Sequence, residues 1–284
     1  MNGPGLSSVG VFVSHYHSDF FNEFLEEFAA ACAFENLRMQ VYRTRQDERV
    51  AEMLRRLTTS SSEEGVIILG LPQRTARDLS LALSIKKYRC VTADTLIPGS
   101  DGSYVGTDNA LGIRLGMNHL MELGHRRILY LVNEPEEAET VRIRVREFHA
   151  VVAEYRLEGS HTFYCGTQFW EDSPEIVYRR MPELCYPGAP YTALFATSDS
   201  GALAALRWLS DNGTSVPEQM SVMGFGDDAP SRLAQPPLST IRQQIPEMAL
   251  KAVAILLSET DAQVFVPPAL IVRQSTGAAP GALG

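Results

Sequence analysis

The chain opens with short apolar runs that alternate with longer amphipathic segments. Val9–Val13 is apolar and rich in β-branched residues, which predicts a buried strand. A helix that Ser18 or Asp19 can cap follows, and its apolar residues share one face: Phe21, Phe24, Leu25 and Phe28. Strand and helix patterns then alternate over Arg38–Tyr42, Glu48–Leu57, Gly65–Leu69, Thr75–Ser84 and Cys90–Ala93. This alternation is typical of a parallel sheet with helices on both faces.

The same rhythm restarts at Asp108 and continues almost to the C-terminus. Helices are predicted over Asp108–Leu123, Val141–Arg156, Pro174–Met181, Ser200–Ser210 and Pro246–Leu257. Strands or extended segments are predicted over Arg127–Val132, His161–Tyr164, Thr192–Ala196, Ser221–Gly224 and Ser239–Gln243, and Val264–Val272 is a last apolar stretch. Two successive units of this kind predict an α/β fold of two doubly wound parallel-sheet lobes. Ligands of such sheets bind beyond the carboxyl ends of the strands, so a cleft between the lobes is the expected site.

Composition agrees with a soluble protein of two lobes. The chain has 284 residues, of which 45% are hydrophobic and 21% charged, and its net charge is −9. An acidic chain is a poor candidate for gripping DNA phosphates by itself. No apolar run approaches the roughly 18–20 residues of a membrane span, and Met1–Ser8 lacks the features of a secretory signal. A cytoplasmic location is therefore expected.

The usual signatures of enzymes and cofactor sites are absent. The sequence has no GxSxG, Walker A, HExxH or GxGxxG motif, so neither an enzyme nor a cofactor is expected. Gly224-Phe225-Gly226 resembles half of a dinucleotide fingerprint, but Asp227-Asp228 would repel a pyrophosphate. His15 and His17 are interpreted as surface residues, not as a metal pair. The four cysteines are scattered without a CxxC spacing, which indicates reduced thiols and no zinc site.

Three longer stretches carry a more specific signal than any single motif. The first is Val105–Asn109 with Gly112, His119-Leu120 and Leu123–Ile128. The second is Thr192–Asp199. The third joins Val216-Pro217, Ser221–Phe225, Pro236–Ile241 and Arg273–Thr276. In this order and spacing they resemble the effector-binding core of the lactose/galactose repressor (LacI/GalR) family of bacterial transcription regulators, and the resemblance runs from about Val9 to Thr276.

The resemblance implies a periplasmic-binding-protein-like fold of type I, with a cleft between the lobes and three crossovers near Thr107, Gln243 and Ala269. The N-terminal lobe is expected over residues 8–107 plus 244–268 and the C-terminal lobe over 108–243 plus 269–277, with loose termini at 1–7 and 278–284. A homodimer that binds a small effector, and no membrane partner, is also implied. Effector binding would shift the population of lobe orientations and so modulate DNA binding.

One part of the family pattern is missing before Val9. Members normally begin with a helix-turn-helix headpiece and a hinge helix, so operator DNA is expected to be bound only through a module outside this chain. That module was cut off, lies elsewhere in the regulator, or does not exist, in which case the protein is a stand-alone ligand-binding protein. A solute-binding protein of a sugar transporter is the alternative function, although the missing signal peptide argues against it.

The resemblance assigns ligand-binding roles, residue by residue, to positions around the predicted cleft: Phe20, Asp94, Arg144, Trp170, Ser198, Asp199, Gly226 and Asp227. Phe20 and Trp170 would be aromatic walls, with core or inter-lobe packing as the alternative. Asp94 would accept hydrogen bonds from vicinal hydroxyls, with a loop cap as the alternative. Arg144 can bind a hydroxyl pair, a carboxylate or a phosphate through its planar fork.

The sequence departs from the family pattern at several of these positions. Ser198 stands where the family typically has asparagine, and Asp199 is interpreted chiefly as the N-cap of the following helix. Gly226 stands where an effector-binding aspartate is common, so either that carboxylate is lost or a one-residue bulge lets Asp227 replace it. Glu147 replaces a glycine of the pattern. The remaining carboxylate and arginine favour a sugar or sugar derivative as the effector, and an acidic sugar fits them.

Overall fold

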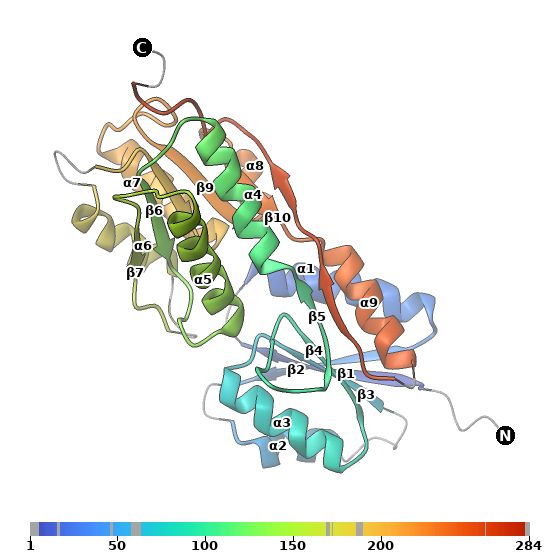
Figure 1. Cartoon of the computed structure of the whole chain (residues 1–284). Coiled ribbons are helices and arrows are strands. Elements are labelled where there is room, and N and C mark those ends of the chain that lie inside the picture. The colour runs from blue at the N-terminus through green and yellow to red at the C-terminus, as the bar shows by residue number, and fades with distance from the viewer. Residues whose placement is uncertain are drawn as a thin grey trace. The chain divides into compact units, whose positions relative to one another are not determined.

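The computed structural model describes residues 6–15, 18–45, 48–57, 64–168, 171, 173–185, 190–258 and 260–281. The chain divides into two compact units. The first unit comprises Met1–Thr107, Glu137–Thr140 and Gln244–Val266, and the second comprises Asp108–Glu136, Val141–Gln243 and Pro267–Gly284. Each unit is an α/β sandwich built around its own sheet (Figure 1).

The first unit contains a six-stranded sheet in which every strand is parallel to its neighbours. Its order is β11-β5-β4-β3-β1-β2. The strands are β1 (Ser8–Ser14), β2 (Arg38–Thr44), β3 (Glu64–Leu69), β4 (Arg89–Ala93), β5 (Ser103–Thr107) and β11 (Gln263–Val266). Helices α1 (Asp19–Phe34) and α9 (Ile245–Leu257) pack on one face, and α2 (Val50–Leu57) and α3 (Gln73–Ile85) pack on the other (Figure 1).

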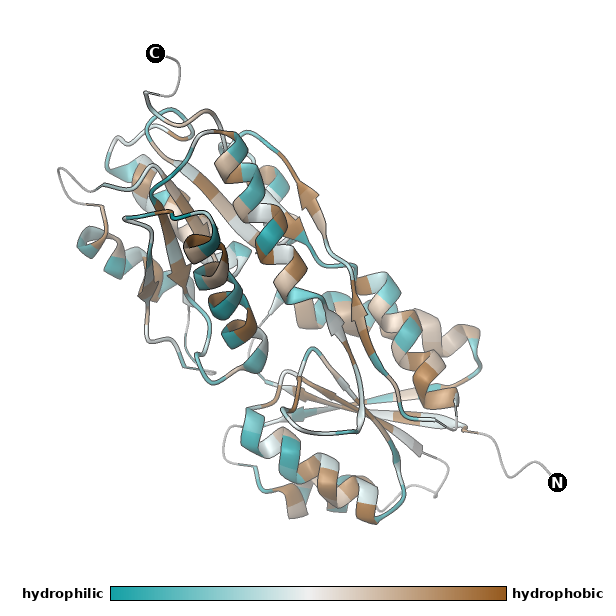
Figure 2. Ribbon diagram, in the orientation of Figure 1, coloured by the Kyte–Doolittle hydropathy of each residue, from teal (hydrophilic) through white to brown (hydrophobic). Residues whose placement is uncertain are grey.

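The second unit has the order β12-β10-β9-β8-β6-β7, and only β12 runs antiparallel, against β10. Its strands are β6 (Ile128–Val132), β7 (His161–Tyr164), β8 (Ala193–Ala196), β9 (Ser221–Gly226), β10 (Ser239–Arg242) and β12 (Ala269–Ile271). Its helices are α4 (Asn109–Glu122), α5 (Glu139–Glu154), α6 (Ser173–Arg180), α7 (Asp199–Asp211) and α8 (Ala229–Leu233), with a short 3₁₀ turn at Met181–Glu183. Apolar residues concentrate on the strands and on the helix faces toward them (Figure 2).

The predicted fold class of two doubly wound α/β lobes is confirmed. The apolar stretch Val264–Val272 consists of two short strands that belong to different units. Pro267 and Pro268 separate them, because a proline has no N–H for the ladder and interrupts a strand. Strand β5 and helix α8 were not predicted, since Ser103–Thr107 mixes polar residues with glycine and α8 has only 5 residues.

His125, in the turn after α4, is buried and fixes three parts of the second unit to one another. Its Nδ1 lies 2.9 Å from Thr192 Oγ1, and its Nε2 lies 3.0 Å from both Ser221 Oγ and the Gly277 carbonyl oxygen. Burial lowers the pKa of His125 below its ordinary value of 6.5. The imidazole is therefore neutral in the folded protein, and it holds the C-terminal segment against the sheet.

Stability is expected to depend on pH through this histidine. The unfolded chain takes up a proton near the ordinary pKa of 6.5, whereas the folded chain resists protonation until lower pH. The contribution of His125 to the free energy of unfolding should therefore be complete above pH 6.5. It should decrease as the pH falls below that value. Urea denaturation across this range checks the expectation. The drop should be shallower in His125→Gln, which lacks the imidazole.

Candidate functional site

The carboxyl ends of β6 and β8 form the topological switch point of the second unit. β7 pairs with one edge of β6 and β8 pairs with its other edge, so the order of the strands reverses at β6. Asn133 and Glu134 follow β6 directly, and Thr197 and Ser198 follow β8. Open α/β sheets bind ligands at such a point, where loops from neighbouring strands diverge. These four residues therefore define the candidate site.

Asn133 is the fully buried centre of the hydrogen bonds at this point. Its side-chain Nδ2 donates to Ser173 Oγ (2.9 Å) and to Ser198 Oγ (2.7 Å). Its Oδ1 accepts from Thr197 Oγ1 (3.1 Å) and from the Ser198 backbone N–H (3.2 Å). Gly201 makes room for this amide, since a Cβ there would lie 2.3 Å from Asn133 Cγ. The two strand ends are thus held together by one side chain.

Ser198 occupies the N-cap position of α7, but its side chain does not cap the helix. Besides Asn133, its hydroxyl contacts Ser200 Oγ at 2.9 Å, and the residue is half-buried. A hydroxyl in this position can both donate to and accept from a ligand. The structure therefore keeps Ser198 among the polar groups at the edge of the sheet.

Asp199 is not the N-cap that the sequence suggested, because it is the first residue of α7 itself. Its fully buried carboxylate accepts from Thr240 Oγ1 (2.5 Å), Ser231 Oγ (2.6 Å) and the Asp228 N–H (2.9 Å). Burial raises the pKa of Asp199, while these hydrogen bonds oppose the shift. Gly224 is required beside it, since a Cβ there would approach Asp199 Oδ1 to 2.2 Å. Asp199 therefore joins α7, β10 and the loop after β9.

Arg144, on α5, is a nearly buried cation with a rigid set of neighbours. Its Nε donates to Asn109 Oδ1 (2.7 Å), and its Nη1 donates to the Thr197 carbonyl (2.7 Å) and to Glu134 Oε2 (2.9 Å). The guanidinium lies 4.0 Å from the ring centroid of Phe225. Within the described part of the chain no hydrogen bond is made by Nη2. The Nη2 group of Arg144 can therefore donate hydrogen bonds to a ligand.

Glu134 is the anionic partner of Arg144. Burial raises the pKa of Glu134, and the positive charge of Arg144 acts in the opposite direction. Desolvation of the carboxylate thus outweighs the attraction of the guanidinium. Glu147, on the same helix as Arg144, points elsewhere and pairs with Arg114 of α4 at 2.5 Å.

Asp227 is buried among arginines in the loop after β9. Its carboxylate accepts from Arg242 Nε (2.7 Å) and Arg273 Nη2 (2.5 Å), and Arg232 Nη2 lies 3.7 Å away. Gly226 has a φ of +143° and Asp227 a φ of +65°, so the glycine re-aims the loop as the sequence suggested. The Asp227 carboxylate is nonetheless directed at arginines of the same unit. No described contact of Gly226 identifies a ligand role for it.

The predicted residues of the first unit lie at the carboxyl edge of its sheet. Phe20 is buried in the core under α1 and stacks on Phe24, which favours its packing role. Its neighbour Phe21 is half-buried and covers Gly70, where a Cβ would lie 2.0 Å from the ring. Asp94 directly follows β4 in a left-handed conformation (φ +49°), and its N–H donates to the Val105 carbonyl (2.9 Å).

Trp170 lies outside the described residues. Among those that are described, no group of three or more His, Cys, Asp or Glu side chains is placed to hold a metal ion. No described helix is long and apolar enough to span a membrane. All four cysteines are free, and burial raises the pKa of their thiols, to about 11 for Cys32 and about 12 for Cys165. These thiols are poor nucleophiles.

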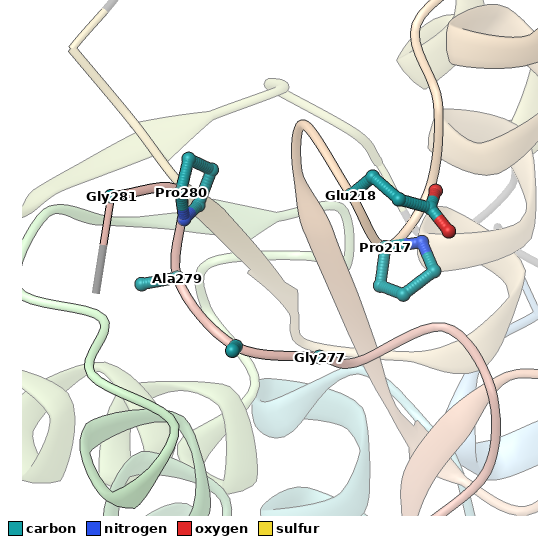
Figure 3. Close-up of a pocket in the computed structure, with 7 residues that line it drawn as sticks. Pro217, Glu218, Gly277, Ala279, Pro280 and Gly281 are labelled. Carbon is teal, nitrogen blue, oxygen red and sulfur yellow. The ribbon is translucent and has the colours of Figure 1, made fainter. Parts of the chain in front are cut away.

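A surface pocket of the second unit lies around the C-terminal segment. Gly277–Gly281 forms one side and Pro217 with Glu218 forms the other (Figure 3). None of the predicted ligand-binding residues lines it. Its walls are mostly proline, alanine and glycine, so it offers few polar groups that could orient a ligand.

Three further polar residues of the site, Asn109, Asn133 and Glu134, were not predicted as site residues from the sequence. Asn133-Glu134 had a detectable signal, because two polar residues directly follow the apolar run Ile128–Val132. Polar residues that end a buried strand of a parallel sheet lie at its ligand-binding edge. Asn109 stands in the first stretch that carries the family resemblance, but no local pattern indicates its contact with Arg144, which joins the start of α4 to the first half of α5.

Comparison with known proteins assigns the family. The family model of the periplasmic binding protein-like domain matches residues 117–276. The chain belongs to this family, in its LacI/GalR branch. The repressor PurR of Haemophilus influenzae (strain PittEE) is 26% identical over 277 residues, which cover 94% of this chain and 81% of PurR. The regulator GalR of Escherichia coli K12 is 30% identical over 65% of this chain and 53% of its own length.

Solved structures of LacI-family regulators have the same fold. A regulator from Enterococcus faecium with bound ribose aligns with a TM-score of 0.81 and 24% identity, covering 96% of this chain and 99% of that one. A regulator from a Rhodococcus species aligns with a TM-score of 0.82 and 25% identity, with the same coverage. A third, from Weissella paramesenteroides with bound glucose, has a TM-score of 0.83 at 20% identity and covers 95% and 98%.

Proposed function

We propose that this LacI/GalR-family chain is the ligand-sensing and dimerising core of a transcription regulator, and that a small carbohydrate binds at the switch point of its second unit. The observation that carries the proposal is the guanidinium of Arg144. It is held by Asn109, Thr197 and Glu134 at the edge of the sheet, and its Nη2 keeps a donor for a ligand. Ser198 adds a hydroxyl beside it, as a polyol ligand requires.

The other predicted contacts divide into two groups. Asp94, at the carboxyl edge of the first unit's sheet, and Trp170 stay proposed ligand contacts, as an acceptor and an aromatic wall. The carboxylates of Asp199 and Asp227 are already bound by other side chains of the protein. We propose that they stabilise the loop after β9 and do not contact the ligand. Phe20 supports α1 from the core.

The proposed action is a population shift without any chemical step. The effector favours one conformation of the core, and in a cytoplasmic homodimer this changes the DNA affinity of an attached DNA-binding module. Coupling free energies of this kind are typically about 1–3 kcal/mol. The helix-turn-helix regulators among its relatives support this role over catalysis.

Calorimetry with pentoses, hexoses, disaccharides and sugar acids tests the proposal, with ribose and glucose included because structural relatives hold them. At 100 times its Kd, a ligand specific for the folded state should also stabilise the protein by about 2.7 kcal/mol. Arg144→Lys should weaken binding at least about tenfold, because lysine lacks the planar fork. Arg146→Lys, exposed on the same helix, is the matched control and should leave the affinity unchanged.

Two outcomes would contradict the proposed function. One is a folded protein that binds no sugar of the panel. The other is a sugar whose affinity is the same for the wild type and Arg144→Lys. Size-exclusion chromatography with light scattering addresses the dimer, and a monomer that binds sugar would favour the transporter alternative.

A further inference from the structure

The ion pair between Glu134 and Arg144 has an uneven exposure. Glu134 Oε2 lies 2.9 Å from Arg144 Nη1, and the side chains are 31% and 4% exposed, respectively. Of the two charges, the carboxylate is therefore the one that a ligand from solvent reaches first. Glu134 comes from the loop after β6 and Arg144 from α5, so the pair belongs entirely to the second unit.

The remaining neighbours of Arg144 carry no charge. They are the amide oxygen of Asn109, the carbonyl oxygen of Thr197 and the ring of Phe225. In the described part of the chain, Glu134 is thus the group that neutralises this nearly buried cation. Without it, the guanidinium would present an uncompensated positive charge to a ligand, and an anion would be its natural counterpart.

The pair also has a defined hydrogen-bonding character. A guanidinium only donates and an ionised carboxylate only accepts, whereas a hydroxyl does both. Two neighbouring hydroxyls of a polyol can accept from Arg144 Nη2 and donate to Glu134 at the same time. A carboxylate or phosphate group can accept from Arg144 but is repelled by Glu134.

We propose that Glu134 is a specificity-determining residue that excludes anionic ligands from Arg144 and selects uncharged polyol groups there. The inference rests on the proposed function, in which Arg144 contacts the effector. It narrows the ligand class to neutral carbohydrates, and it argues against the acidic sugar that the sequence alone allowed. Selection of this kind uses a repulsive element against the wrong ligand as well as an attractive one for the right ligand.

Binding of inorganic phosphate, measured by calorimetry in a phosphate-free buffer, tests the proposal without knowledge of the effector. Glu134→Gln keeps the size of the side chain and an oxygen for Arg144, but it removes the charge. It should bind phosphate at least about tenfold more tightly than the wild type. Glu136→Gln removes the same charge from an exposed position two residues away and should change phosphate affinity by less than about twofold.

The double variant Glu134→Gln/Arg144→Gln shows where the phosphate binds. The gain in affinity should disappear in it, because the guanidinium is gone. A gain that persists there, an equal gain in Glu136→Gln, or no gain in Glu134→Gln would each overturn the proposal. Circular dichroism checks that the variants are folded, and Glu134→Ala provides a second neutral variant if Glu134→Gln does not fold.

Neutral sugars separate this proposal from the proposed function. If the wild type binds no sugar and Glu134→Gln gains phosphate, the exclusion of anions stands and the carbohydrate-sensing function fails. If the wild type binds a neutral sugar and Glu134→Gln gains no phosphate, the function stands and the role of Glu134 fails. A sugar acid that binds the wild type more tightly than its neutral parent would also overturn the role of Glu134.

Discussion

Asp227→Ala is expected to lower the free energy of unfolding by about 2–4 kcal/mol. Loss of one partner of a fully buried ion pair costs about 3–5 kcal/mol, because the other charge is left without compensation. The cost is discounted here because the Arg242 side chain is 41% exposed, whereas that of Arg273 is only 15% exposed. Alanine adds strain at the left-handed φ of +65°, which aspartate and asparagine tolerate better.

Chemical denaturation of matched variants measures this effect. Asp227→Asn keeps the shape and the left-handed tolerance and removes only the charge, so its loss should be smaller. Asp211→Ala is the surface control, since its partner Arg207 is 73% exposed and such exposed pairs contribute little to stability. Equal losses in Asp227→Ala and Asp211→Ala would show that the arginine cluster contributes no more than a surface pair.

Gly201→Ala is expected to destabilise the protein by roughly 1–3 kcal/mol, although alanine is the better helix former. In an unobstructed helix the same change stabilises by about 1 kcal/mol. Here the new Cβ would lie 2.3 Å from Asn133 Cγ, and Asn133 is fully buried and bonded on several sides. Overpacking of a rigid interior outweighs the helix propensity. Thermal and urea denaturation measure the loss.

A second substitution tests whether α7 tolerates alanine at a position where no steric conflict is expected. Ser210→Ala changes an exposed position of the same helix and should alter stability by no more than a few tenths of a kcal/mol. If Gly201→Ala is as stable as the wild type, Asn133 can move, and the hydrogen bonds that join β6 and β8 are more adaptable than the structure indicates.

The elements of this fold follow from local patterns in the sequence. The strands near His161–Tyr164 and Thr192–Ala196 and the helix near Ser200–Ser210 all have the periodicity of their secondary structure, and the structure places them within a residue or so of their predicted ends. Periodicity alone does not show that Val264–Val272 is divided between two units, and the expectation of a boundary near Ala269 came from the family resemblance. Pro267 and Pro268 mark a break in the apolar pattern, but only tertiary pairing with β5 and β10 shows that β11 and β12 belong to different sheets.

The site was harder to predict, because a side chain's role depends on neighbours far away in sequence. Asp199 has the sequence context of a helix cap, yet its carboxylate is occupied by Ser231 and Thr240. In the sequence Glu134 is an ordinary acidic loop residue. Only the folded structure shows that Arg144 of α5 lies 2.9 Å from it. A local sequence pattern does not show which distant residues a side chain will contact.

The first unit, although it contains the N-terminus, can be completed only late in synthesis. Its helix α9 and edge strand β11 come from Gln244–Val266, and α9 supplies much of the core beneath α1. Until the ribosome has released these residues, the earlier strands expose an unfinished apolar face and an open β5 edge. An open strand edge of this kind can pair with the wrong strand or with another chain. Five of the six strands of the second unit, β6 to β10, are synthesised between these two parts of the first unit, so β1 to β5 wait for α9 and β11 throughout that time. The N-terminal part of the nascent chain is therefore the most prone to aggregation.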